Sequence, residues 1–576
     1  MCDASEEDTG WSRRRFLAAS LGTGASLIPI GRLFAGAAEG GEPPPGFPSS
    51  IVVYRQAYRN WAHEIEVDGV WTCEPRTAED VVLLANWAHV HGYTLRAQGF
   101  RHGWAPLTVP GVETSAKTVL LDTRTYLTAV EVVNASPSAV RAQTGISMDA
   151  LLQFLEDNGL GVTNTPAPGD LTLGGVLAIN GHGSSLPAAD EVLSEGHTFG
   201  SLSNLVVSLT AVVWDNARRR YALRTFHRGE RLCSALLTCL GRGFVTEAVL
   251  RVGVNSNLRC VSTVDISAAE LFAAPGTPGA RTFAGFVEET GRVDAIWLPF
   301  TDAPWLKVWT VSPIKPKSSR ETREPYNYPF SDSIPEEMAE LYRQITEGAT
   351  FLAPTLGQLQ YEVVATGLVT TRSADLWGRS KNLQLYIKPT TARLHANGYA
   401  ILTRRANLQQ VLHEIATRYT ELLGEYAARG DYPINGPADF RVTGLDVPGD
   451  VRVAGARAPA LSAARPHDAH PEWDIAVWLD ILTHPGTASS NRFYRELEEF
   501  LLSRYCGVDA MVRVEWSKGW GYTDSARWAS ETLLSHRIPE SYRTGSDVDW
   551  NWAVHALDTL DPHRVFTNSL LDTMLR

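Results

Sequence analysis

The alternation of short strands and capped helices in the first half of the chain constrains its fold most. Thr77-Ala78-Glu79-Asp80 predicts a helix start, because a threonine cap followed three residues later by a carboxylate satisfies two free backbone N–H groups. Apolar residues at helical spacing follow, and Gly92 predicts the end of this helix. A strand at 93–97 comes next, and a second strand, cap and helix occupy 140–159. The alternation runs through Val252 and predicts an α+β or α/β first half.

The second half has a different texture, with longer polar loops between isolated strands. Strand-like runs occur at 293–298 and 476–482. Residues 316–333 are rich in proline, serine and charge, which predicts a long surface loop or lid. A chain of 576 residues exceeds one small core, so two or three large lobes are expected.

The N-terminus has the layout of a twin-arginine export signal. Ser12-Arg13-Arg14-Arg15 opens an apolar run that reaches Ile30, and Ala35-Gly36-Ala37 offers a cleavage site. We therefore expect residues 1–37 to be a signal peptide read by the twin-arginine export machinery, followed by a proline-rich linker at 38–47. The protein would then be secreted, or associated with the cell envelope, in a bacterium. A surface basic helix is the alternative interpretation.

Charge and cysteine pattern exclude several classes of function. The net charge is −12, and no block of lysine and arginine follows the N-terminus, which argues against nucleic acid as the main partner. The six cysteines show no CxxC spacing and the histidines no H-E-x-x-H motif, so no metal site is expected.

Three glycine-bearing loops in the first half could hold a phosphate group. They span 99–103, 168–183 and 241–246. Glycine lets the backbone approach a ligand closely, and successive N–H groups can then surround a pyrophosphate. None of the loops fits G-x-G-x-x-G or a P-loop, so a nicotinamide-binding Rossmann domain and a P-loop ATPase are both disfavoured.

These loops, in their order, resemble the FAD-binding (PCMH-type) domain of the vanillyl-alcohol oxidase family, and within it the covalent-flavin (type II) cholesterol oxidases. The similarity covers about 48–576 and rests on Gln98-Gly99-Phe100-Arg101-His102, Thr172-Leu173-Gly174-Gly175, Trp297-Leu298-Pro299-Phe300-Thr301, Glu515-Trp516-Ser517-Lys518-Gly519-Trp520 and Asp561-Pro562-His563-Arg564-Val565-Phe566. The resemblance implies a two-lobed α+β fold. An FAD-binding domain would span 48–256, and a substrate (cap) domain with a large antiparallel sheet flanked by helices would span 257–545. The C-terminal segment 546–576 would return to the FAD domain.

The same resemblance implies how FAD is held. His102 takes the position of the histidine that bonds covalently to the flavin 8α-methyl group; a histidine that only stacks on the cofactor is the alternative. No cysteine lies between Cys73 and Cys233, so a second covalent link is excluded. The other implied FAD-binding residues are Gln98, Gly99, Phe100, Arg101, Gly103, Pro168, Gly169, Asp170, Thr172, Gly174, Gly175, Asn180, Gly181, His182, Gly183, Gly243, Phe244, Val245 and Asn568.

Asp439 and Arg441 are the strongest candidates for catalysis. Residues i and i+2 of a strand share a face, so this carboxylate and guanidinium would project together. From the residues alone, a surface ion pair worth about 0–1 kcal/mol is the simpler interpretation. The resemblance instead makes Asp439 the base that takes the hydroxyl proton. Arg441 would steady that base or, with Asp294, gate the cavity.

Three of these positions depart from the family pattern. The pattern has Glu at the positions of Asp439 and Asp294 and Asn at that of Asp480, whereas all three are Asp here. Shortening a catalytic arm matters, because a misplacement near 1 Å can cost about 10²-fold in rate. A third carboxylate could also raise the pKa of a neighbouring carboxyl. The substrate is therefore less certain than the oxidase chemistry.

The resemblance implies an FAD-dependent oxidase that converts the 3β-hydroxyl of cholesterol or a related sterol to a ketone, with isomerisation to the 4-en-3-one as a following step, and reduces O₂ to H₂O₂. Three alternatives stay open: an oxidase of a different bulky alcohol, a dehydrogenase with another electron acceptor, and a flavin-bearing sterol-binding protein without turnover. Oligomeric state and transient contact with a membrane surface are left open. Weaker site candidates are Glu515, Lys518, and Tyr386 and Lys388 on an expected strand.

Overall fold

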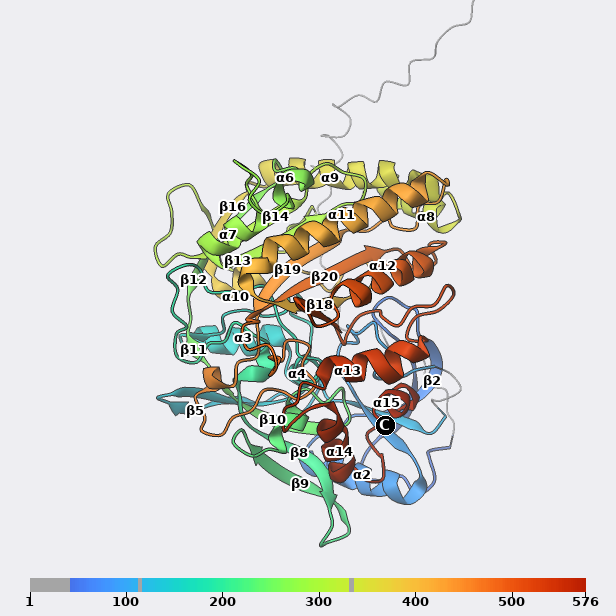
Figure 1. Cartoon of the computed structure of the whole chain (residues 1–576). Coiled ribbons are helices and arrows are strands. Elements are labelled where there is room, and N and C mark those ends of the chain that lie inside the picture. The colour runs from blue at the N-terminus through green and yellow to red at the C-terminus, as the bar shows by residue number, and fades with distance from the viewer. Residues whose placement is uncertain (1–41, 112–115, 331–335) are drawn as a thin grey trace, which may run out of the picture.

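Each of the two lobes of the molecule is built on its own sheets (Figure 1). The computed structural model describes residues 42–111, 116–330 and 336–576. The predicted export signal lies outside these residues. Mixed helices and sheets in two lobes, with a large, mainly antiparallel sheet in the second lobe, confirm the fold expected from the sequence.

The predicted helix caps of the first lobe are confirmed. Helix α2 (Ala78–His91) begins with a capping box of Thr77 and Asp80 and ends at Gly92, whose φ of 67° is left-handed and suits glycine. Helix α3 (Met148–Asp157) begins after Ser147, whose hydroxyl accepts the N–H of Ala150. Local chemistry alone therefore fixes where these two helices start.

Two sheets make up the core of the first lobe. The first has the order β1 (Val53–Arg59), β2 (Glu66–Cys73), β4 (Thr118–Asp122) and β3 (Thr94–Gln98). The second has the order β5 (Val130–Ala135), β6 (Ser138–Gln143), β10 (Phe244–Arg251), β8 (Val206–Asp215) and β9 (Arg220–His227). The short strands β7 (Leu160–Gly161) and β11 (Gly253–Val254) pair with each other.

A ten-stranded sheet, counted within the described residues, carries the second lobe. Its order is β15 (Arg320–Thr322), β16 (Asp375–Arg379), β12 (Asn257–Thr263), β14 (Trp305–Val311), β13 (Arg292–Trp297), β19 (Ala438–Gly444), β20 (Ile475–Thr483), β18 (Tyr399–Thr403) and β21 (Ala510–Val514), with β17 (His395–Ala396) also paired to β20. All of these pairs are antiparallel except β15 with β16.

Helices cover one face of this sheet with a continuous apolar core. Side chains of α7 (Phe283–Thr290), α11 (Leu408–Ala427) and α12 (Ser490–Arg504) pack on inward residues of β13, β19 and β20. The opposite face carries the charged residues described below, and α8 (Glu336–Thr346) and α9 (Ala353–Thr370) lie beyond the β12–β14 part of it. The remaining helices are α4 (Leu173–Ala178), α5 (Cys233–Leu237), α6 (Ala268–Leu271), α10 (Ser380–Gln384), α13 (Ile538–Tyr542), α14 (Trp550–Leu560) and α15 (Ser569–Met574), with 3₁₀ turns Leu202–Leu205, Thr350–Leu352, Arg405–Asn407 and Pro448–Val451 and a π-turn Leu533–Arg537.

Two local predictions need correction. Within the predicted surface loop at 316–333, residues 320–322 form β15 and Tyr328 is buried, so its described part is packed against the sheet rather than lid-like; residues 331–333 lie outside the described part. Tyr386 and Lys388 lie in a loop rather than on a strand, because residues 386–388 make only an isolated bridge at Ile387. The end of the predicted linker packs on α2, where the Trp87 indole N–H donates to the Pro45 carbonyl.

No helix among the described residues is both long and apolar enough to cross a bilayer.

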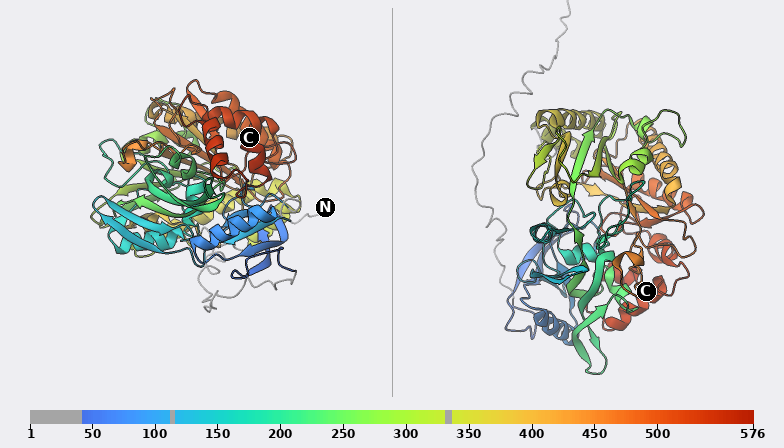
Figure 2. Two further views of the ribbon diagram at one scale, coloured as in Figure 1. Left: turned by 90° about the horizontal axis from the view of Figure 1, so that it is seen from below. Right: turned by 90° about the vertical axis from the view of Figure 1, so that its left-hand side faces the viewer.

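The last residues of the chain lie in the first lobe, which is the lower one in Figure 1 (Figure 2), and the Asn568 side chain there donates to the carbonyls of Pro106 and Leu107. Asp561 is buried and receives hydrogen bonds from Arg242, Tyr221 and the N–H groups of Val565 and Phe566. The Arg242 guanidinium is itself fully enclosed and lies 2.6 Å from Asp561. Both ends of this ion pair are thus desolvated.

Removing one partner of a buried ion pair leaves the other charge uncompensated, which costs about 3–5 kcal/mol. We therefore expect Asp561→Ala to lower the free energy of unfolding by that amount, as measured by urea denaturation followed by tryptophan fluorescence. Asp558 also pairs with Arg242 but is 40% exposed, so Asp558→Ala should cost about 1 kcal/mol or less. Equal effects of the two substitutions would contradict the assignment.

Candidate active site

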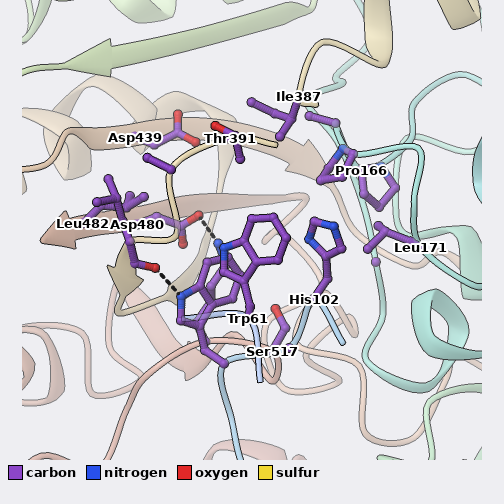
Figure 3. Close-up of a pocket in the computed structure, with 18 of the residues that line it drawn as sticks. Trp61, His102, Pro166, Leu171, Ile387, Thr391, Asp439, Asp480, Leu482 and Ser517 are labelled. Carbon is purple, nitrogen blue, oxygen red and sulfur yellow. Dashed lines mark hydrogen bonds and ion pairs between the residues drawn. The ribbon is translucent and has the colours of Figure 1, made fainter. Parts of the chain in front are cut away.

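A cavity of about 520 Å³ lies where the two lobes meet. Its lining comes from the first two glycine loops of the lower lobe, from the charged face of the large sheet, and from α8 and α9. Figure 3 shows Trp61 and His102 entering from the lower lobe and Asp439 and Asp480 from the sheet. The volume and largely apolar lining suit a cofactor together with an apolar substrate.

His102 is held in place on two sides. Its ring stacks on Trp61 with 3.8 Å between centroids, and its Nε2 lies 2.9 Å from a carboxylate oxygen of Asp170. The Arg393 guanidinium lies over the Trp61 ring, 4.3 Å from its centroid. The stacked indole and the nearby carboxylate together favour one orientation of the imidazole ring in the cavity.

The two glycine loops contact each other directly. A Cβ at Gly99 would lie 2.5 Å from the Thr172 hydroxyl oxygen, so only glycine fits there. Arg101 and Asn180 have left-handed φ values of 64° and 53°, a conformation that costs energy in a non-glycine residue and concentrates at functional sites. Both loops are thus shaped by tertiary contacts rather than by local preference.

The residues of these loops fit FAD. The Asn180 side-chain amide nitrogen and the Gln98 amide oxygen are buried without a hydrogen-bond partner among the described residues, and both residues line the cavity. A flavin carries acceptors and donors that could satisfy such groups. The predicted cofactor residues that line the cavity are Gln98, Gly99, Phe100, Arg101, His102, Gly103, Pro168, Thr172, Gly175, Asn180, Gly181 and His182.

The other predicted cofactor residues are not part of that lining. Gly169, Asp170, Gly174 and Gly183 belong to the second loop, where Gly174 N–H donates to Thr144 and Gly183 N–H to Asn164. Gly243 precedes β10, and Phe244 and Val245 begin it, with Phe244 in the core of the first lobe. The Asn568 side chain donates to the carbonyls of Pro106 and Leu107.

Arg96 explains why these distant segments belong together. Its buried guanidinium donates to the carbonyls of Leu107, Leu240, Gly241 and Phe566. Burial lowers the pKa of Arg96 to about 10, which still leaves it charged at neutral pH. The first and third glycine loops and the C-terminal segment are therefore fixed by one cation, and the third loop supports the site without lining it.

Strand register gathers the predicted catalytic residues on one face of the sheet. Asp439 lies opposite Asp480 on β20, and Arg441 lies opposite Asp294 on β13. Directly opposite residues of an antiparallel pair share a face. The predicted same-face pair is confirmed, since Arg441 Nε lies 3.1 Å from Asp439 Oδ2. Arg441 also forms an ion pair with Asp480, whereas no ion pair joins it to Asp294 in the part of the chain that the structure describes.

The pKa values of the two facing carboxyls, Asp439 and Asp480, are shifted in opposite directions. Burial alone would raise the pKa of Asp480, but Lys518, 3.0 Å away, and Arg441 outweigh it and lower that pKa. Burial raises the pKa of Asp439 well above its ordinary value, and the negative charge of Asp294 adds to the effect more than Arg441 opposes it. The site therefore favours the ionised form of Asp480 and the protonated form of Asp439.

The weaker candidates for site residues differ in whether they line the cavity. Glu515 and Lys518 line the cavity, and burial followed by the charge of Asp480 raises the pKa of Glu515 to about 7. Tyr386 also lines it and donates to Asp294 over 2.6 Å. His182 stacks on Trp478 at 3.6 Å, and burial lowers its pKa to about 3, so it acts as neutral packing. Lys388 is not among the lining residues.

Sequence reasoning missed the role of Trp61 beneath His102 and missed Lys307 altogether. Trp61 carried a signal in the motif Asn60-Trp61, but its partner lies 41 residues further on. Lys307 sits in the run Trp305-Leu306-Lys307-Val308-Trp309, where a lysine alternating with tryptophans on one strand face could have marked a buried cation.

Comparisons with known proteins place the chain in a family. The family model described as the substrate-binding domain of cholesterol oxidase matches residues 257–576, and an FAD-binding domain model matches residues 71–215. The chain belongs to the cholesterol oxidase family. No curated protein sequence matches it significantly.

Solved cholesterol oxidases share its fold over nearly the whole chain. A solvent-stable cholesterol oxidase is 52% identical, aligns over 93% of this chain and 100% of its own, and has a TM-score of 0.91. The cholesterol oxidase of Brevibacterium sterolicum is 44% identical over 93% of this chain and 99% of its own, again with a TM-score of 0.91. The resemblance inferred from the glycine loops is therefore confirmed, and the first lobe is an FAD-binding domain.

Proposed function

We propose that this chain is an FAD-dependent oxidase that converts the 3β-hydroxyl of cholesterol or a related sterol to the ketone. The observation that carries the proposal is the Asp439–Arg441–Asp480 cluster facing the same apolar cavity as His102. Bound FAD would supply the acceptor for the hydride of the carbinol carbon, and O₂ would be the final acceptor of both electrons, giving H₂O₂. The family and the substrate-binding domain support a sterol as the substrate.

Asp439 takes the hydroxyl proton in this scheme. A general base works best when its pKa lies near the working pH, and burial with the neighbouring Asp294 charge moves Asp439 toward that condition. Arg441, 3.1 Å away, orients the carboxyl, and Asp480 with Lys518 fixes Arg441 in turn. For a sterol with a 5,6 double bond, a carboxyl of this cluster also moves the proton that converts the first ketone to the 4-en-3-one.

The covalent link and the export route belong to the proposal. His102, which stacks on Trp61 and lies with Nε2 2.9 Å from Asp170, would be the residue that bonds to the flavin. Export by the twin-arginine route rests on the motif at 12–17 and suits an enzyme that folds around its cofactor before it leaves the cytoplasm.

Oxygen uptake and peroxide formation test the electron acceptor. The purified holoenzyme should consume O₂ and form one H₂O₂ per sterol oxidised, and it should be inactive on aryl and sugar alcohols. Sterol turnover only with an added dye acceptor would show a dehydrogenase. Turnover of another alcohol alone would show that the three Asp positions have changed the pocket.

A further inference from the structure

Lys307 is a buried cation beside the proton-transfer site. It lies on β14 near the centre of the large sheet (Figure 1), and its side chain has no exposure to solvent. Its ammonium nitrogen has no hydrogen-bond partner among the described residues. A desolvated lysine without such a partner is costly unless another interaction replaces its hydration.

Aromatic rings provide that interaction. The ammonium nitrogen lies 3.3 Å from the ring centroid of Tyr386, 4.3 Å from that of Tyr328, 4.9 Å from that of Trp305 and 5.2 Å from that of Trp309. A desolvated cation over a ring face gains about 2 kcal/mol or more. Four rings therefore enclose Lys307, and the nearest belongs to a residue that lines the cavity.

Tyr386 links this cation to the carboxyls. Its hydroxyl donates to Asp294 over 2.6 Å, and Asp294 is the residue directly opposite Lys307 on the neighbouring strand. Asp294 in turn is the nearby charge that adds to the burial effect on Asp439. One chain of contacts thus runs from Lys307 through Tyr386 and Asp294 to the proposed base.

We propose that Lys307 is a positioning residue for proton transfer: its charge, acting through the ring of Tyr386, holds the phenol on Asp294 and so fixes the charge that faces Asp439. The inference rests on the proposed function, in which Asp439 is the base. A cation over the ring face draws electron density from the phenol, which makes its hydroxyl a better donor. It also attracts both carboxylates, since Lys307 lies near Asp294 and Asp439.

The groups facing Lys307 make the direction of the effect clear. They are Cys260 and Ser262 on β12, Asp294 on β13, Tyr328, Tyr386, and Asp439 on β19. Burial lowers the pKa of Lys307 to about 8, and the thiol of Cys260 has a raised pKa, so below pH 8 the lysine is charged while the thiol is neutral. The positive charge of Lys307 favours the ionised form of the Asp439 carboxyl, so removing this cation must raise the proton affinity of Asp439.

The role of Lys307 can be tested without turnover. The affinity of the oxidised holoenzyme for a 4-en-3-one steroid is measured across pH from the change in the flavin absorption band. A protonated Asp439 donates to the ketone oxygen, so affinity should fall as pH rises through its titration. Lys307→Met should move that midpoint upward by about half a pH unit or more. Tyr386→Phe should also move the midpoint, and the added effect of Lys307→Met should be smaller in that background than in wild type, because part of the effect of the lysine passes through the phenol.

Lys315→Met, a change at an exposed lysine, is the matched control and should leave the midpoint in place. An unchanged midpoint in Lys307→Met, or fully additive shifts in the double variant, would overturn the proposal. Should Lys307→Met fail to fold, Tyr386→Phe decides, and an unmoved midpoint there refutes it. Asp439→Asn distinguishes failure of the proposed function from failure of the Lys307 proposal. If steroid binding to Asp439→Asn keeps its pH dependence, Asp439 is not the base. If that pH dependence is lost but Lys307→Met leaves the wild-type midpoint in place, only the role of Lys307 is wrong.

Discussion

Asp439→Asn should slow reduction of the flavin by sterol by about 10²–10⁴-fold, the range usual for loss of a general base. Asparagine keeps the size of the side chain and the contact with Arg441 but cannot accept a proton. The wild-type rate should also rise with pH, because the pKa of Asp439 is raised and only its carboxylate form can take the hydroxyl proton. Anaerobic stopped-flow measurement of the flavin band across pH provides both results.

Asp439→Glu is the matched control for this prediction. It keeps the carboxyl and restores the side chain that the family pattern has at this position, so it should retain flavin reduction within about 10²-fold of wild type. A wild-type rate in Asp439→Asn, with an unchanged pH profile, would show that another carboxyl is the base. Glu515, with a pKa of about 7, would then be the next residue to test.

His102→Ala should yield protein whose FAD is released completely by acid precipitation, whereas wild-type FAD should remain with the polypeptide. The mass of the denatured wild-type chain should exceed that of the variant by about one FAD. The physical reason is the placement of His102, which Trp61 and Asp170 hold in one orientation inside the cavity. A covalent link also raises the flavin potential, so sterol should reduce the variant more slowly.

His182→Ala is the comparison for that experiment, since His182 also belongs to a glycine loop and lines the same cavity. Its ring stacks on Trp478 and its Nδ1 lies 3.1 Å from the Gly183 carbonyl oxygen, so its variant should keep acid-stable FAD. Equal release of FAD from wild type and His102→Ala would rule out the covalent bond while leaving the FAD-binding domain in place.

Local sequence signals predicted those parts of the fold that depend on neighbouring residues. Thr77 and Asp80 specify a helix start by themselves, and the i, i+2 spacing of Asp439 and Arg441 already implies a shared strand face. The register that brings Asp480 and Asp294 onto that face joins three strands far apart in the sequence, and only the resemblance to a family indicated it. Local patterns carry no information on such pairing.

Other features depended on tertiary contacts that no spacing reveals. Gly243 to Val245 carried a glycine-loop pattern, yet Arg96 turns that loop into support for the first one. Lys307 gave no motif, because its significance arises from rings contributed by β14, Tyr328 and Tyr386. The raised pKa of Asp439 likewise comes from burial and from a neighbour on another strand.

The measurement that tests the central claim most directly is anaerobic mixing of the holoenzyme with cholesterol, followed at the visible band of the flavin, with the steroid product identified afterwards. The account predicts fast loss of the band and one 3-keto steroid per flavin, despite Asp at three positions where the family pattern has Glu or Asn. A flavin that shifts its spectrum with cholesterol but is never reduced would contradict the account and mark the chain as a sterol-binding flavoprotein without turnover.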